Sequence, residues 1–155
     1  MIDWSRTFHT GIRVPDLDAA MAEQGAPLGV TWAQPQERQQ PLWTPERGLH
    51  TVPLRFVYSC EGPNHIELLQ GTPDTFWDGR QQPGAHHIGV WADDVPAETK
   101  ALEAKGWTLV GAGAPPEDGY GIYTYLAPPS GLIVELVGSI AQPMFERWWA
   151  GGALA

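Results

Sequence analysis

The sequence predicts an α+β fold made of two βαβββ modules in tandem. Two stretches, residues 9–16 and 87–94, each begin with His, carry Gly two places on and end with Asp seven places on, in a short alternating apolar run. Each stretch is followed later by an apolar segment that contains one Glu, Glu67 in the first case and Glu135 in the second. The extended and helical segments between His and Glu have the same order in both halves, which indicates a duplicated module.

The first module begins with an alternating segment, residues 8–14, that is typical of a β-strand with one apolar face. Its other face carries His9 and Arg13 and is expected to line a cavity. Asp16 can cap a helix, which we expect to run to about residue 24 and to end at Gly25.

The rest of the first module is predicted to contain a long loop and further strands. Residues 34–48 are rich in Pro and Gln, and we expect them to form a loop that shapes the pocket. Strands are expected at residues 30–33, 54–60 and 65–70. On the last of these, His65 and Glu67 share a face.

The second module repeats this order after a linker rich in Pro and Gly. His87 and Trp91 lie on the face that corresponds to His9, and Asp94 caps a helix to about residue 105. Shorter strands and a final aromatic helix follow, at residues 108–110, 122–126, 132–137 and 142–149. We therefore divide the chain, as a single domain of residues 1–155, into module one (about 6–70), a linker (71–84), module two (85–139) and a C-terminal segment (140–155).

Composition narrows the class of partner. The chain is 43% hydrophobic, which is enough for a core, and its formal net charge of -9 argues against nucleic acid or an anionic membrane as partner. Cys60 is the only cysteine, so no internal disulfide is possible. No apolar run approaches the roughly 20 residues of a membrane span, and the first residues lack the apolar core of a signal peptide. We expect a cytoplasmic protein that acts on a small molecule.

The two His and two Glu residues together predict a metal site. A lone carboxylate between apolar neighbours is costly to bury without a partner, and both Glu67 and Glu135 have such neighbours. Two imidazoles and two carboxylates are a suitable ligand set for one divalent metal ion. His87 is preferred to His86 as ligand because it keeps the same seven-residue distance to Asp that His9 keeps, although a one-residue slip of the strand would reverse this choice.

These residues resemble the vicinal oxygen chelate superfamily, which includes glyoxalase I, methylmalonyl-CoA epimerase, extradiol dioxygenases and the fosfomycin and bleomycin resistance proteins. The resemblance is carried by residues 8–16, 65–70, 86–91 and 130–137. It implies that the two modules form a cupped, half-open barrel and that the protein is a homodimer. It also implies one metal ion (Zn, Ni, Co, Mn or Fe) on the first and last strands of each module, with these ligands: His9, Glu67, His87 and Glu135.

The resemblance implies a metal-dependent lyase or an isomerase such as an epimerase, which stabilises an enolate beside a substrate carbonyl. Glu135 is then the general base and Glu67 its partner on the opposite side. One alternative is an Fe(II) extradiol-type dioxygenase, although the second carboxylate, Glu67, counts against it. The other alternative is a metal-free resistance protein that binds a drug. No run of basic residues suits the phosphates of CoA, which counts against an epimerase.

Four more side chains are candidates for lining the substrate site. Arg13 is suited to a substrate carboxylate or phosphate, or to a salt bridge at the rim. His65 is a candidate acid or base or an ordinary surface histidine, Trp91 could wall a flat substrate, and Tyr123 could donate to a substrate oxygen or pack in the sheet.

Overall fold

The computed structural model describes all residues, 1–155, and its elements repeat one order twice. The first module contains β1 (Thr7–Arg13), α1 (Leu17–Leu28), β2 (Gln36–Thr44), β3 (Gly48–Tyr58) and β4 (His65–Gly71). The second contains β5 (Gly84–Ala92), α2 (Val95–Glu103), β6 (Thr108–Ala112), β7 (Tyr123–Ala127) and β8 (Ile133–Gly138). The helix α3 (Gln142–Trp149) follows, and three short 3-10 helices lie at Trp4–Arg6, Pro116–Asp118 and Ser139–Ala141. The predicted α+β class with two tandem βαβββ modules is confirmed.

The chain divides into two compact units that are interleaved along the sequence. Residues 9–40, 52–86 and 143–155 form one, which we call the Glu67 unit. Residues 1–8, 41–51 and 87–142 form the other, the Glu135 unit. The tip of the β2–β3 hairpin therefore belongs to the Glu135 unit, although it comes from the first module.

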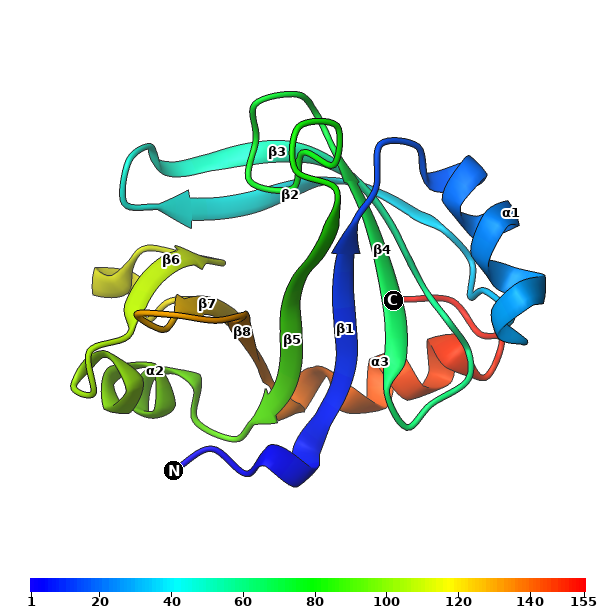
Figure 1. The fold of residues 1–155 in the computed structure, drawn as a ribbon. Coiled ribbons are helices and arrows are strands. Elements are labelled where there is room, and N and C mark those ends of the chain that lie inside the picture. The colour runs from blue at the N-terminus through cyan, green and yellow to red at the C-terminus, as the bar shows by residue number, and fades with distance from the viewer. The chain divides into compact units, whose positions relative to one another are not determined.

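The Glu67 unit is a mixed sheet with α1 along β4 (Figure 1). β4 lies between its neighbours, parallel to β1 and antiparallel to β3. The Asp16 carboxylate accepts a hydrogen bond from the Ala19 backbone N–H at 2.9 Å and caps α1, as predicted. An apolar core fills the space between helix and sheet, and its buried residues are Val14, Leu17, Ala20, Val57 and Leu68.

Helix α1 is longer than predicted. It passes through Gly25 and ends at Leu28, where Gly29 takes the left-handed conformation with φ of 66°. Gly25 is inside the helix because the Trp32 ring packs directly on it: an added Cβ would lie 3.0 Å from Trp32 Nε1. The absence of a side chain here serves packing rather than helix termination, which the sequence pattern does not distinguish.

The prediction of a loop at residues 34–48 is wrong. Most of it forms β2, the first strand of a hairpin whose second strand is β3. Gln36 to Pro41 are exposed or half-buried, so their polar composition reflects a solvent-facing strand. The sequence rule that associates Pro and Gln with loops fails because strand pairing, rather than side-chain burial, defines this segment.

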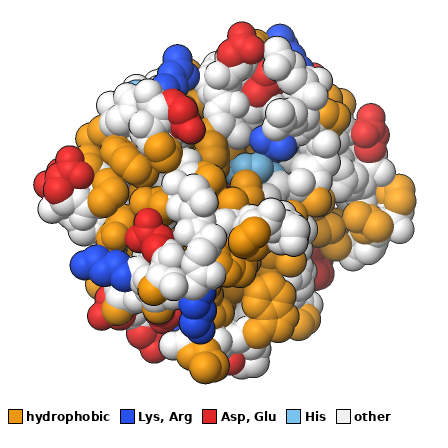
Figure 2. Space-filling model, turned by 60° about the vertical axis from the view of Figure 1, so that its left-hand side comes forward, with side chains coloured by type: hydrophobic (Ala, Val, Ile, Leu, Met, Phe, Trp, Pro, Cys, Tyr) orange, Lys and Arg blue, Asp and Glu red, His pale blue; other side chains and the backbone are white.

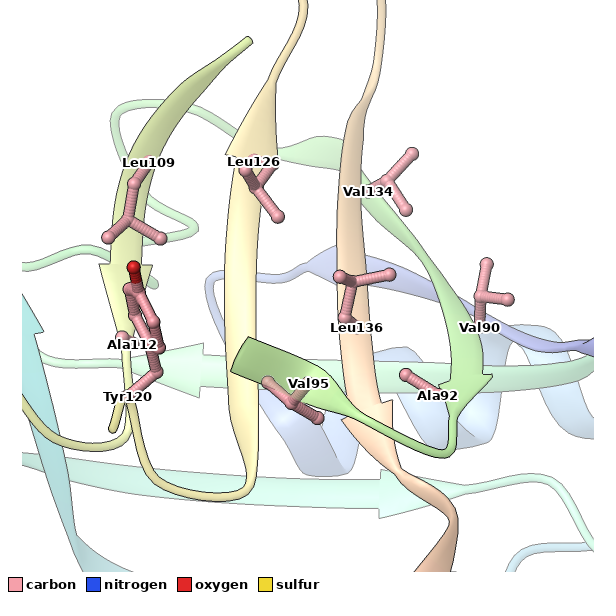
Figure 3. Close-up of a cluster of buried hydrophobic side chains, with 9 residues drawn as sticks. All are labelled: Val90, Ala92, Val95, Leu109, Ala112, Tyr120, Leu126, Val134 and Leu136. Carbon is pink, nitrogen blue, oxygen red and sulfur yellow. The ribbon is translucent and has the colours of Figure 1, made fainter. Parts of the chain in front are cut away.

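The Glu135 unit is a sheet with strand order β5-β8-β7-β6. β8 is parallel to β5 and antiparallel to β7, and Trp43 of β2 pairs with Ala112 of β6. Figure 3 shows the core of this unit, in which apolar side chains from the strands meet Val95 at the start of α2. Asp94 caps α2 through the Ala97 backbone N–H at 3.0 Å.

Two further features are the distribution of charged side chains on the surface and the length of the helices. Figure 2 shows acidic side chains scattered over the drawn face and only a few basic ones among them, with no broad basic patch in that view. No helix combines the length and the apolar character that crossing a bilayer requires.

Candidate metal and substrate site

The four side chains predicted as metal ligands are all buried. Their exposed fractions are 0% for His9, 6% for Glu67, 0% for His87 and 7% for Glu135. Buried imidazole and carboxylate side chains are groups that could hold a metal ion. Each of the two compact units contributes one His and one Glu.

In the Glu67 unit, the parallel pairing of β1 and β4 brings His9 and Glu67 together. Glu67 is in register with Gly11, two residues beyond His9 on the same face of β1. Because Gly11 has no side chain, the Glu67 carboxylate can reach along the strand toward the imidazole. The His9 Nε2 and the Glu67 Oε2 lie 3.2 Å apart.

The Glu135 unit repeats this arrangement. β5 and β8 are parallel, Glu135 is in register with Gly89, and Gly89 lies two residues beyond His87. The His87 Nε2 and the Glu135 Oε2 are again 3.2 Å apart. Equal strand direction, register and atomic separation mean that the duplication seen in the sequence extends to the chemistry of each pair.

Each pair also has a tyrosine at an equivalent place, and sequence reasoning did not consider the one in the Glu67 unit. Tyr58 of β3 is in register with Glu67, and Tyr125 of β7 with Glu135. Both phenol rings have their centroids 5.1 Å from the imidazole of their own pair. The available signal was a tyrosine nine residues before Glu67 and ten before Glu135.

The donor atoms of each pair suit neighbouring positions on one cation. Ligand bonds of about 2.1 Å separate neighbouring donors by about 3.0 Å in octahedral and about 3.4 Å in tetrahedral geometry. The observed 3.2 Å lies between these values. Neutral imidazole and carboxylate are ligands of Zn, Mn, Fe, Co and Ni, and a cation would offset the cost of burying two carboxylates. The residues present therefore fit a divalent metal ion.

Of the two adjacent histidines, His87 contacts the glutamate. The ring of His86 lies edge-on to Phe76, with centroids 4.9 Å apart. Alternation along β5 turns neighbouring side chains to opposite faces, so only one of them can belong to the pair.

His65 and Arg13, both predicted to line the substrate site, are held by contacts inside the Glu67 unit. The His65 ring stacks on Trp149 of α3 at 3.7 Å, and its Nδ1 lies 2.7 Å from the Ser59 carbonyl oxygen. Burial lowers the pKa of the His65 imidazole, which favours the neutral ring. Arg13 donates from Nη1 to the Phe76 carbonyl at 3.3 Å, and burial lowers its pKa as well.

Trp91 and Tyr123 make packing contacts in the Glu135 unit. The Trp91 ring stacks on Phe8 with centroids 3.7 Å apart and planes inclined by 7°. The Tyr123 hydroxyl donates a short hydrogen bond to the Pro41 carbonyl. These contacts fix both rings in place, and their roles toward a substrate stay predictions.

Comparison with known proteins shows the family of the chain. Residues 8–125 match the family model of the glyoxalase/bleomycin resistance protein/dioxygenase superfamily. An ethylmalonyl-CoA/methylmalonyl-CoA epimerase from Cereibacter sphaeroides is 30% identical over 140 residues, which cover 84% of this chain and 96% of the relative.

Solved structures share the fold. The methylmalonyl-CoA epimerase of Streptomyces coelicolor, in complex with 2-nitronate-propionyl-CoA, matches with a TM-score of 0.59 and 24% identity, over 86% of this chain and 93% of that one. The methylmalonyl-CoA epimerase of Mycobacterium tuberculosis matches with a TM-score of 0.59 and 18% identity, over 89% and 92%. This likeness confirms the predicted glyoxalase-like fold. The repeated modules and the matched family model together show that the chain belongs to the glyoxalase/bleomycin resistance protein/dioxygenase superfamily.

Proposed function

We propose that this protein is a metal-dependent epimerase that inverts the carbon next to the thioester carbonyl of a 2-alkylmalonyl-CoA. The observation that carries the proposal is the repeated His–Glu pair, with Nε2 and Oε2 atoms 3.2 Å apart in each unit. The similarity to an ethylmalonyl-CoA/methylmalonyl-CoA epimerase supports the choice of substrate class.

The two pairs together would hold one divalent ion through His9, Glu67, His87 and Glu135, which are all buried. When bound, such an ion supplies Lewis-acid stabilisation to the negative charge that develops on the thioester oxygen as the neighbouring C–H bond loses its proton. The two histidines would hold the ion through Nε2, the atom that lies 3.2 Å from the carboxylate in each pair, and both imidazoles are fully buried. Elemental analysis of the purified protein identifies the metal.

The two carboxylates move the proton. Glu135 accepts it from the substrate carbon at a carboxylate oxygen, and the electron pair of that C–H bond passes into the carbonyl group. Glu67, from the other module and protonated at the start, gives its proton to the same carbon on the opposite face and is left as a carboxylate, so that the configuration inverts. The reverse reaction starts with Glu135 protonated and Glu67 as the carboxylate. Each module supplies one of these two carboxyl groups. An epimerase needs such a pair because each group acts as the base in one direction of the reaction and as the acid in the other.

The proposal is tested by incubating the protein with a single epimer of methylmalonyl-CoA or ethylmalonyl-CoA in D₂O. We expect inversion at the 2-position together with incorporation of solvent deuterium, which proton NMR and mass spectrometry record. Activity should disappear after removal of metal with a chelator and return when a divalent ion is added back. A protein that binds metal but neither inverts these thioesters nor exchanges their 2-hydrogen would disprove the assignment.

The extradiol dioxygenase alternative has a separate readout. Such an enzyme consumes oxygen in the presence of a catechol, whereas the proposed proton transfer consumes none. Loading the protein with Fe(II) and following dissolved oxygen with catechol therefore distinguishes the two reactions.

A further inference from the structure

A cleft of about 500 Å³ lies within the Glu67 unit, away from the His9–Glu67 pair along β4. Its walls come from β2, β3, the C-terminal end of β4 and the segment that follows. Three arginines from separate elements line it: Arg38 on β2, Arg55 on β3 and Arg80 beyond β4. Glu37 is the one acidic residue in its wall.

This gathering of arginines is unexpected in a chain with 9 Lys and Arg against 18 Asp and Glu. The Arg55 guanidinium is held by the Asp18 carboxylate at 3.2 Å and by the Glu37 carboxylate at 3.4 Å. The acidic residue of the wall is therefore already paired, and the hydrogen bond that Arg55 donates to the Asp18 carboxylate raises the pKa of Arg55.

Arg38 and Arg80 differ from Arg55 in that no carboxylate forms a salt bridge with them. Both are exposed and neither forms a salt bridge, although the backbone N–H and then the charge of Arg80 act on the nearby Asp78 carboxylate and help to lower the pKa of Asp78. The Arg38 guanidinium lies over the Phe56 ring, 5.6 Å from its centroid. This cation–π contact holds the guanidinium in place without neutralising its charge. Two exposed guanidinium groups that form no salt bridge, beside a polar cleft, are suited to phosphate, which they can bind through paired N–H donors.

Position along β4 relates the cleft to the predicted reaction site. Gln70 in the cleft wall lies three residues beyond Glu67 on the same strand, a distance of about 10 Å at the usual rise per residue. Its side chain accepts a hydrogen bond from the Leu17 backbone N–H of α1 and so lies on the opposite face of β4 from the Glu67 carboxylate. CoA carries its diphosphate and 3′-phosphate at the far end of a long pantetheine arm. A phosphate site for CoA must therefore be separated from the reacting carbon, as this cleft is separated from Glu67.

We infer that the cleft binds the phosphate groups of the CoA that carries the substrate, chiefly through Arg38 and Arg80. This inference rests on the proposed function. It also explains why the sequence contains no basic run suited to CoA: the arginines are 17 and 25 residues apart and meet only in the folded chain.

The test measures binding of desulfo-CoA, which lacks the thiol and cannot react, by isothermal titration calorimetry at low salt. We expect Arg38→Gln and Arg80→Gln each to weaken binding about tenfold or more, since each removes a charged hydrogen-bond donor. Arg147→Gln is the matched control, because Arg147 is exposed and lies outside the cleft. Unchanged affinity in both cleft variants, or an equal loss in the control, would overturn the inference.

Two competitors identify the chemistry that the cleft recognises. ADP should displace desulfo-CoA, whereas inorganic phosphate at the same concentration should displace little. Displacement by phosphate as effective as that by ADP would reduce the cleft to a general anion site and overturn the inference.

Kinetics separate this inference from the proposed function. The cleft variants should raise KM for a 2-alkylmalonyl-CoA but leave kcat, and the KM of the matching pantetheine thioester, unchanged, because the latter has no CoA phosphates at this end. If desulfo-CoA binding depends on the two arginines but no thioester exchanges its 2-hydrogen, the cleft assignment stands and the epimerase assignment fails. A rise in KM that is equal for both thioesters would contradict the cleft assignment alone.

Discussion

Glu135 is the residue whose replacement tests the chemistry most directly. Glu135→Gln keeps the size of the side chain but removes its ability to accept a proton. We expect the variant to fold and its turnover to fall by about 10²-fold to 10⁴-fold, the usual contribution of a general base. Deuterium incorporation into substrate, followed by NMR, measures the loss.

Glu23→Gln is the control for this variant, since Glu23 is exposed on α1 and the same carboxylate-to-amide change there should leave turnover intact. Far-UV circular dichroism checks that both proteins are folded. Full activity in Glu135→Gln would remove this residue as the base.

Gly79 is a residue at which substitution should lower the stability of the fold. A Cβ added at this position would lie 2.3 Å from the backbone carbonyl of Val14. Because backbone atoms cannot move aside cheaply, Gly79→Ala should lower the free energy of unfolding by about 1–3 kcal/mol or more. Urea unfolding measures it, with the exposed Gln82→Ala as control; equal stability of the two variants would show that the loop can shift.

Single residues were predicted best where strand alternation decides their direction. His9 and His87 could be paired with Glu67 and Glu135 because each Glu repeats at the same place in a duplicated strand pattern. Tyr58 was missed because its position beside His9 depends on the antiparallel register of β3 and β4, which the sequence does not state. The cleft arginines were missed for the same reason.

At the scale of elements, α3 tests how much a terminal helix contributes. Trp148 on this helix is fully buried, its Nε1 donates to the Gln34 carbonyl at 3.1 Å, and its ring lies 5.4 Å from Tyr58. Trp148→Ala should lower the free energy of unfolding by about 3–5 kcal/mol. Urea unfolding followed by circular dichroism measures it, with the exposed Trp4→Ala as control, and a change as small as that of the control would mean that α3 adds little.

Elements with clear periodicity and caps were predictable, and those defined by their partners were not. Asp16 and Asp94 cap their helices as expected, and α3 has the predicted bounds. β2 was mistaken for a loop because the side chains of its first six residues, 36–41, are exposed or half-buried, so this part of the pattern carries no apolar signal. The end of α1 was misplaced because Gly25 serves the packing of Trp32.

For the whole molecule, metal binding tests whether the two His–Glu pairs act together. We expect one divalent ion per chain, and at about 100 times its dissociation constant the ion should stabilise the fold by about 2.7 kcal/mol. Thermal unfolding with and without chelator, together with elemental analysis, measures both quantities.

Single-site variants distinguish one shared ion from two separate ones. If the pairs share an ion, His9→Gln and His87→Gln should each abolish both the bound metal and the stabilisation. Independent sites would leave each variant with a bound ion. His50→Gln, a half-buried histidine outside the pairs, is the control. The family and the fold class could be read from the sequence, whereas assembly into a homodimer stays a prediction.

The hairpin of β2 and β3 has a consequence for any attempt to split the gene. Its tip, residues 41–51, completes the Glu135 unit, where Trp43 pairs with Ala112 and the Tyr123 hydroxyl donates to the Pro41 carbonyl. A cut in residues 72–83 would thus give a C-terminal fragment that lacks an edge of its own sheet. Likewise, the N-terminal fragment would lose α3, including the Trp149 ring that stacks on His65 and contacts Tyr58 at a tilt. Neither fragment contains a complete compact unit, so we expect neither to fold alone. Co-expression of the two fragments should recover the native protein.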